Sequence, residues 1–113
     1  MTRLDGADLS HYQYDHGPID WPTLRASTWW VAHKATQGVT YVDPKFATAW
    51  PEMAVGFTHR LAYHWLSPGA DPAQQAAHFL DTWDRSGGAM LDAEEGGITV
   101  AQALTWLRTV EAQ

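Results

Sequence analysis

Two carboxylates, Asp92 and Glu94, stand one residue apart where a short apolar run gives way to Gly96 and Gly97. An apolar run followed by glycines is typical of a strand that breaks into a turn. Alternate side chains of a strand share one face, so both carboxyls are expected on the same side, with Cα atoms roughly 6.5–7 Å apart. At that separation the less solvated carboxyl has a raised pKa and can donate a proton, while the other stays anionic. Such a pair is the minimum equipment for glycoside hydrolysis, although an acidic surface turn would contain the same residues.

The rest of the chain alternates between strand-like and helix-like segments, and this alternation predicts how the carboxylates are positioned. Four segments are expected strands, at 4–9, 28–33, 59–65 and 89–92, and the second of them is rich in β-branched and aromatic residues. A helix-like segment follows each strand, at 20–25, 43–54, 71–86 and 99–110. Strands that alternate with helices predict an α/β fold with a parallel sheet and right-handed crossovers. Four βα units correspond to half of an eight-stranded barrel of TIM type or to a small open sheet.

Capping residues predict where the helices begin. Asp43 and Asp71 each precede a proline, which suits an N-cap followed by proline at the first helical position. Thr99 and Gln102 have the spacing of a capping box for the last helix. Pro51 is expected to kink or shorten the second helix. One face of the last helix is expected to be buried, and it consists of Val100, Ala103, Leu104, Leu107 and Val110.

Each predicted strand has polar side chains at its C-terminal edge. In chain order the pairs are Asp8 and Ser10, His33 and Lys34, Tyr63 and His64, and Asp92 and Glu94. In parallel α/β folds this edge is where ligands bind, so we expect these groups to surround one site. Tyr63 is equally compatible with a packed strand residue, and Lys34 with an ion-pair partner of the carboxylates.

Composition narrows the classes of function. The 113 residues suffice for one modest domain, and 45% apolar with 18% charged residues is typical of a globular chain. The net charge of −6 argues against nucleic acid and anionic membranes as partners, and no apolar run approaches the ~20 residues of a membrane span. The first residues also lack the apolar core of a signal peptide. The chain has no cysteine, so the sequence predicts no disulfide. It has no glycine-rich phosphate loop and no pair of ligands at metal-binding spacing, so it predicts neither a nucleotide cofactor nor a metal.

Several motifs resemble those of glycoside hydrolase family 25, the muramidases or lysozymes that act on peptidoglycan. Gly6-Ala7-Asp8-Leu9-Ser10-His11-Tyr12-Gln13 is similar to the family's opening pattern Gly-x-Asp-x-Ser-x-x-Gln, and Leu91-Asp92-Ala93-Glu94 is similar to its Asp-x-Glu signature. The similarity continues in the same order through Ile19-Asp20-Trp21, Lys34-Ala35-Thr36-Gln37-Gly38, Tyr41-Val42-Asp43-Pro44-Lys45-Phe46 and Ala62-Tyr63-His64. The resemblance implies a TIM-type (β/α) barrel, of which residues 1–113 would form a single partial domain with about the first four βα units.

The resemblance also implies roles for the polar residues. Glu94 would be the general acid that protonates the leaving oxygen. Asp92 would either attack the anomeric carbon or orient the substrate's own 2-acetamido group to do so, and strand spacing leaves both open. Asp8 would stabilise positive charge near that carbon. The implied substrate-binding side chains are Tyr63, His64 and Lys34, of which the tyrosine would contact the acetamido group.

The implied activity is cleavage of the β-1,4 bond between N-acetylmuramic acid and N-acetylglucosamine, outside the cell or in the cell wall. The chain departs from the family at Gln37, where Glu is usual, and at Leu61, where Gly commonly precedes Ala-Tyr-His. Family domains are also roughly twice as long, and one acidic site residue belongs to a strand that would lie beyond Gln113. An alternative function is therefore a catalytically incomplete family member that acts as a wall-binding or structural module.

A half barrel would leave both outer strands and one side of the core exposed. We expect a second copy, a partner chain or further residues to cover them. The missing leader fits both a phage lysin released by lysis and a fragment of a longer protein. A flavodoxin-like binding domain is a third interpretation, but it needs five strands and the sequence predicts four.

Overall fold

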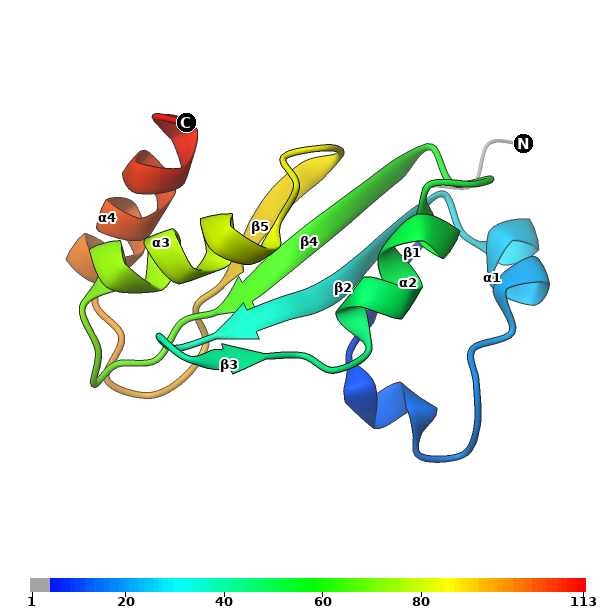
Figure 1. The fold of residues 1–113 in the computed structure, drawn as a ribbon, viewed down its shortest axis with the longest axis horizontal. Coiled ribbons are helices and arrows are strands. Elements are labelled where there is room, and N and C mark those ends of the chain that lie inside the picture. The colour runs from blue at the N-terminus through cyan, green and yellow to red at the C-terminus, as the bar shows by residue number, and fades with distance from the viewer. Residues whose placement is uncertain (1–4) are drawn as a thin grey trace.

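The computed structural model describes residues 5–113 and shows a mixed α/β fold with one mainly parallel sheet (Figure 1). The parallel strands lie side by side in chain order and are β1 (Gly6–Leu9), β2 (Trp30–Gln37), β4 (His59–Trp65) and β5 (Gly88–Asp92). The helices are α1 (Trp21–Ser27), α2 (Phe46–Met53), α3 (Pro72–Thr82) and α4 (Val100–Glu111), with a short 3-10 turn, η1 (His11–Tyr14), after β1. The predicted alternation and the parallel pairing are confirmed. Leu4, where the first strand was predicted to start, lies outside the described residues.

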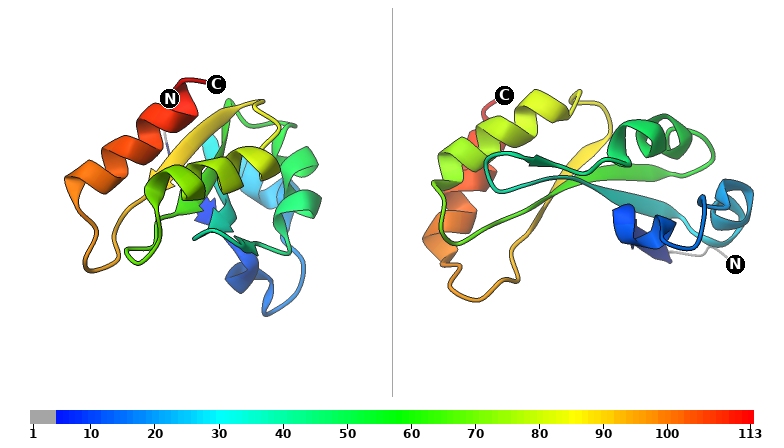
Figure 2. Two further views of the ribbon diagram at one scale, coloured as in Figure 1. Left: turned by 60° about the vertical axis from the view of Figure 1, so that its left-hand side comes forward. Right: turned by 60° about the horizontal axis from the view of Figure 1, so that its bottom comes forward.

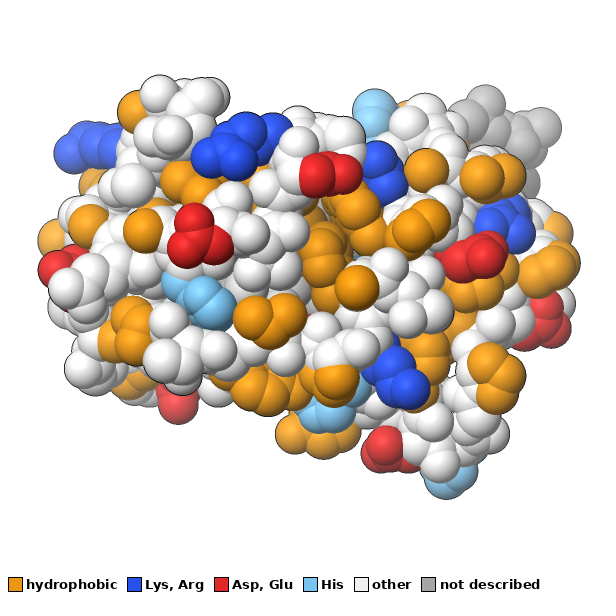
Figure 3. Space-filling view, viewed as in Figure 1, with side chains coloured by type: hydrophobic (Ala, Val, Ile, Leu, Met, Phe, Trp, Pro, Cys, Tyr) orange, Lys and Arg blue, Asp and Glu red, His pale blue; other side chains and the backbone are white. Residues whose placement is uncertain are grey.

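All four helices pack on one face of the sheet, which we call the helix face. Its core consists of strand residues such as Val31 and Ala62 with apolar residues of α2, α3 and α4, and Leu24 of α1 is partly buried against it. Figure 2 shows α3 and α4 next to each other, and the rings of Phe79 and Trp106 join them with centroids 5.1 Å apart. Charged side chains are scattered among hydrophobic ones over the side seen in Figure 3. None of the helices within residues 5–113 is long and apolar enough to cross a membrane.

Helix caps predicted from sequence are confirmed for α3 and α4. The Asp71 carboxylate accepts from the Ala73 amide at 2.8 Å, and Thr99 and Gln102 form the reciprocal capping box. The prediction that Asp43 caps the second helix is wrong, because α2 begins at Phe46 and the Asp43 carboxylate is buried elsewhere. The third helix also ends earlier than predicted, at Thr82 rather than before the glycine pair at 87–88, and Gly88 opens β5.

The predicted buried face of α4 is only partly correct. Val110 is buried, but Val100, Leu104 and Leu107 are 77%, 40% and 38% exposed. The helix is fixed instead by Trp106, whose buried ring stacks on His64 of β4 and packs at a tilt against Phe79 of α3. The remaining apolar stripe has no helix beside it in the described part of the chain, so the amphipathic pattern is real but half of it faces solvent.

Two features of β2 were not predicted. A two-residue strand, β3 (Tyr41–Val42), pairs antiparallel with its end. In addition, the register between β2 and β4 shifts between Lys34 and Thr36, which is a β-bulge with Ala35 as the extra residue. Neither feature leaves a periodic signal, because a two-residue strand is too short to alternate and a bulge interrupts alternation.

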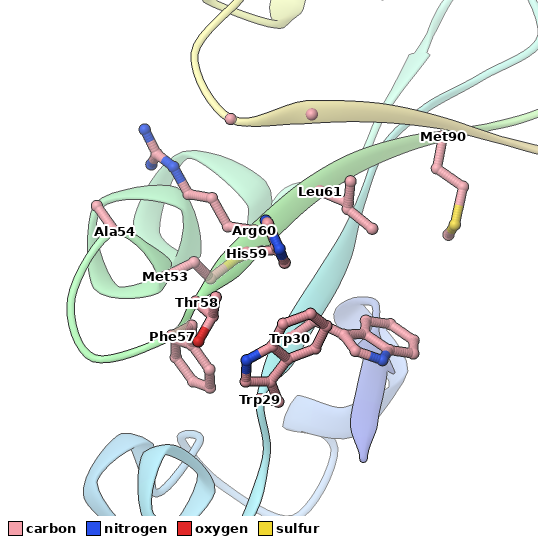
Figure 4. A pocket seen from close by; sticks show the side chains of 12 residues that line it. Trp29, Trp30, Met53, Ala54, Phe57, Thr58, His59, Arg60, Leu61 and Met90 are labelled. Atoms are coloured by element: carbon pink, nitrogen blue, oxygen red, sulfur yellow. The ribbon is translucent and has the colours of Figure 1, made fainter. Parts of the chain in front are cut away.

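The opposite face of the sheet carries no helix among the described residues, and we call it the open face. Leu61 and Met90 point to this side in Figure 4, whereas Arg60 points to α2 and donates to the Trp50 carbonyl at 2.8 Å. A hollow of about 730 Å³ lies at the strand N-termini, and Leu61 and Met90 help to line it. The indole of Trp30 lies over Gly6, where a Cβ would come within 1.7 Å of the ring, so this position of β1 requires glycine.

Candidate active site

Asp92 and Glu94 lie at the C-terminal end of β5, as predicted from the sequence. Asp92 is the last strand residue, and its carbonyl accepts from the Leu66 amide at 2.9 Å, which ties β5 to the end of β4. The pKa of the Asp92 carboxyl is raised to about 6, by burial first and then by interaction with Glu94 and with Asp8, while Lys34 opposes the shift. Glu94, two residues on, is exposed. Asp92 is therefore the more buried of the two carboxyls.

Tyr63 and Asp8 face the same acidic centre from two other strands. Tyr63 is 9% exposed, and its pKa is raised by burial first and then by four carboxylates, among them Asp8, Asp92 and Glu94. Asp8 is exposed near the end of β1, opposite Ala32 in the register. Because β1, β4 and β5 run parallel, these side chains share the C-terminal edge of the open face. The structure thus brings together Asp8, Tyr63, Asp92 and Glu94.

Lys34 joins this centre from β2, directly opposite Tyr63. Its ammonium donates to Gln37 Oε1 and lies 5.2 Å and 5.6 Å from the ring centroids of Tyr41 and Trp65. Burial lowers the pKa of Lys34, and nearby carboxylates including Asp92 oppose that shift. A cation among carboxylates and aromatic rings gives the edge both donors and flat faces, which is suited to a sugar.

His64 is placed on the other side of the sheet, which corrects its prediction as a substrate-binding residue. Its side chain has no exposed surface, and the ring lies between Thr36 Oγ1 at 2.7 Å and Gln75 Oε1 at 2.9 Å. Adjacent strand residues point to opposite faces, so Tyr63 on the open face requires His64 on the helix face. His33 is likewise fully buried there, 6.1 Å from the Phe46 ring.

One buried group near the centre, Asp43, was missed as a site neighbour. The Asp43 carboxylate accepts from the His11 amide at 2.9 Å, from the Lys45 amide at 2.8 Å, and pairs with His11 Nδ1 at 3.0 Å. Its Asp-Pro context is typical of a helix cap, so this role could not be predicted from the neighbouring residues. Ser10 and Gln13 of the opening motif form a capping box for η1, with Gln13 Oε1 2.6 Å from the Ser10 amide. The spacing of these two residues was a usable signal for the cap.

No three His, Asp or Glu side chains within residues 5–113 gather in a way that could hold a metal ion. The chemistry available at the edge is that of carboxylic acids, an ammonium, a phenol and aromatic faces.

Comparison with known proteins identifies the family. The family model described as "Glycosyl hydrolases family 25" matches residues 7–113. The chain belongs to glycosyl hydrolase family 25. It is 28% identical to Lysozyme M1 of Streptomyces globisporus over 125 aligned positions, covering 97% of this chain and 42% of that protein. It is 41% identical over 86 positions to the uncharacterized protein YegX of Escherichia coli (strain K12), covering 69% of this chain and 32% of that protein.

Solved family 25 structures share the fold. A bacterial lysozyme from Streptomyces coelicolor superposes with a TM-score of 0.74 at 26% identity, covering 98% of this chain and 57% of that one. A family 25 glycosyl hydrolase from Bacillus anthracis superposes with a TM-score of 0.77 at 23% identity, covering 96% and 53%. The family 25 chain therefore spans about a third to two-fifths of these curated relatives and little more than half of the solved chains.

The raised pKa of Asp92 predicts a stability gain on neutralising it. In the folded chain this pKa is about 6, above the ~3.9 of an unfolded Asp, so ionisation at neutral pH opposes folding and the penalty disappears below about pH 4. We expect Asp92→Asn to raise the free energy of unfolding by about 1–2 kcal/mol at about pH 7.5, allowing for solvent screening of a partly exposed carboxyl. Urea unfolding at about pH 7.5 and pH 4 measures this. The same stability difference at both pH values would contradict the assigned pKa.

Proposed function

We propose that this family 25 chain carries the catalytic acids of a peptidoglycan hydrolase that cleaves the β-1,4 bond between N-acetylmuramic acid and N-acetylglucosamine. The observation that carries the proposal is the convergence of Asp8, Tyr63, Asp92 and Glu94 at one strand edge, with the Asp92 pKa raised to about 6. When two interacting carboxyls differ in solvation, one can act as a proton donor while the other stays ionised, as glycoside hydrolysis requires. Family membership supports glycoside hydrolysis as the reaction class.

In the proposed mechanism Glu94 protonates the oxygen of the leaving sugar. Asp92 either attacks the anomeric carbon or holds the 2-acetamido group for attack, and Asp8 stabilises the positive charge that develops there. Tyr63 contacts the acetamido group, and Lys34 contributes a donor beside the aromatic rings of Tyr41 and Trp65.

Lys34 supports the division of roles between the two acids. Burial raises the pKa of Asp92 in the free chain, and the charge of Lys34 opposes that shift. Lys34 therefore favours the aspartate anion that the proposed mechanism requires, while Glu94 lies exposed at the strand edge.

A second candidate function is a wall-binding module without catalysis. The observation in its favour is that the chain spans only 53–57% of the two solved relatives described above, and Gln37 replaces a usual acid. Incubation of the purified chain with bacterial walls separates the two functions. Release of muropeptides with new N-acetylmuramic acid reducing ends, detected by mass spectrometry, supports hydrolysis. Co-sedimentation with walls in the absence of release supports the binding module.

We further propose that the described residues form half of a TIM-type barrel whose open face is covered in the working protein. β1 and β5 each have one unpaired edge in the described sheet, and the hollow of about 730 Å³ is lined by apolar side chains including Leu61 and Met90. Exposed apolar surface and free strand edges both favour association. We expect the purified 113-residue chain to sediment as an assembly larger than its 12.6 kDa monomer. A monodisperse monomer that unfolds cooperatively would contradict this expectation.

A further inference from the structure

The β-bulge in β2 decides which side chains of that strand reach the open face. Before the bulge, Lys34 lies on the open face opposite Tyr63. Ala35 belongs to the core of the helix face, and Thr36 also points there because its hydroxyl contacts His64. The extra residue therefore returns Gln37 to the open face, where Lys34 Nζ donates to its Oε1. Strict alternation from Lys34 would have sent Gln37 to the helix face.

A buried polar network holds this bulge in place. Thr36 Oγ1 lies 2.7 Å from His64 Nδ1, and His64 Nε2 lies 2.9 Å from Gln75 Oε1. Thr36, His64 and Gln75 have no exposed surface. A buried polar group must find partners inside the protein, so these three side chains fix one another's orientation.

The backbone around Gln75 assigns the direction of every hydrogen bond in the network. Gln75 Nε2 donates to the carbonyls of Ser67 at 2.8 Å and Ala70 at 3.1 Å, and Oε1 accepts from the Ser67 amide at 3.0 Å. His64 must then donate from Nε2 to Oε1, which leaves Nδ1 to accept from the Thr36 hydroxyl. Burial keeps the ring neutral by lowering the pKa of His64 to about 4. The hydrogen bonds thus connect the loop after β4 with Gln75 of α3, Gln75 with His64 of β4, and His64 with Thr36 at the bulge.

We propose that Thr36, His64 and Gln75 are positioning residues that fix the bulge of β2 and so hold Gln37 beside Lys34 on the open face. The network itself rests on the observed contacts, and its role in binding a glycan rests on the proposed function. None of the three side chains touches the open face, so their effect on binding is transmitted through the backbone of β2.

Substitution of Thr36 tests the network without requiring activity. In Thr36→Val the shape is kept and the hydroxyl is lost, so the bulge is released from His64. We expect the nuclear Overhauser contacts between the Gln37 side-chain amide and Lys34 to disappear in Thr36→Val and to persist in Thr36→Ser. Thr105→Val is the matched control, because this exposed hydroxyl contacts only the α4 backbone carbonyl of Ala101, at 3.0 Å. Unchanged Gln37–Lys34 contacts in Thr36→Val would overturn the proposal.

A second measurement needs only the parent chain and stands even if Thr36→Val does not fold. Long-range proton–nitrogen spectra of His64 at neutral pH should show a protonated Nε2 and an unprotonated Nδ1. The opposite tautomer would contradict the bond directions and overturn the network.

Binding of soluble muropeptide disaccharide connects the network to the proposed function. We expect Thr36→Val to weaken binding about 3–10-fold, which corresponds to the free energy of roughly one hydrogen bond, here the bond between Thr36 and His64. Thr36→Ser keeps this bond and should bind as the parent does. In a Gln37→Ala background the same substitution should change binding little, whereas a general loss of stability would act equally in both backgrounds. A parent chain that binds no muropeptide would count against the proposed function. The nuclear Overhauser contacts between Gln37 and Lys34 would still test whether the network fixes the bulge.

Discussion

Replacing Glu94 with glutamine is expected to lower peptidoglycan cleavage by about 10²–10⁴-fold, because the amide cannot donate the proton that the leaving oxygen requires. Glu94 is exposed and follows the last residue of β5, so the substitution should leave folding intact. Release of muropeptides from purified walls measures the rate, in whichever assembly of the chain is active. The circular dichroism spectrum and thermal midpoint should match those of the parent.

Glu111→Gln is the matched control for this experiment. This substitution makes the same change of charge at the exposed C-terminal end of α4. That helix contributes no residue to the strand edge. Wall cleavage by Glu94→Gln at the parent rate would remove Glu94 from the mechanism. Equal losses in both variants would point to the net charge of the chain rather than to a general acid.

Acid is expected to destabilise the fold through His64. The pKa of this buried ring is about 4 in the folded chain, below the ~6.5 of an unfolded histidine. Above about pH 6.5 both states are neutral and the stability is fully present. As the pH falls, the unfolded chain takes up the proton first, so about 3 kcal/mol of unfolding free energy is lost by about pH 4.

The contribution of His64 has to be measured as a difference between variants, because Asp92 acts in the opposite direction between about pH 4 and 6. Urea unfolding of the parent and of His64→Gln at about pH 7 and pH 4 isolates it. The stability advantage of the parent should shrink by about 3 kcal/mol at the lower pH. His16→Gln makes the same substitution at an exposed histidine and is the matched control. Parallel pH profiles for the parent and His64→Gln would contradict the assignment.

Local signals in the sequence sufficed for most of the fold. The strand predicted at 59–65 matches β4 residue for residue, and the caps at Asp71 and Thr99 start α3 and α4 as expected. Such signals work because capping bonds and strand alternation join residues close in sequence. Asp43 carried the same local signal, but its carboxylate accepts from the Lys45 amide, before α2 begins, and from the amide of His11, 32 residues away in the chain. The distant contact could not be predicted from local sequence.

The face of the sheet to which each site residue points could be predicted where side chains alternate regularly along a strand. Asp92 and Glu94 share the strand edge, and Asp8 and Tyr63 join them from other strands, as the sequence indicated. His64 was misassigned although the same rule decides it, because a neighbour of Tyr63 must point to the other face. The position of Gln37 could not be predicted, since it depends on a bulge of β2 that contacts His64 of β4 and, through it, Gln75 of α3.

The order of the strands also sets how the backbone of this chain opens to solvent. β2 and β4 are paired on both sides, whereas β1 and β5 each leave one row of amides without a strand partner in the described sheet. Hydrogen exchange should therefore be slowest in β2 and β4 and fastest, among the parallel strands, in β1 and β5. Asp8 lies on β1 and Asp92 ends β5. The two strands that carry these carboxylates are thus the ones most easily deformed, and slower exchange there would report directly on whatever comes to lie against them.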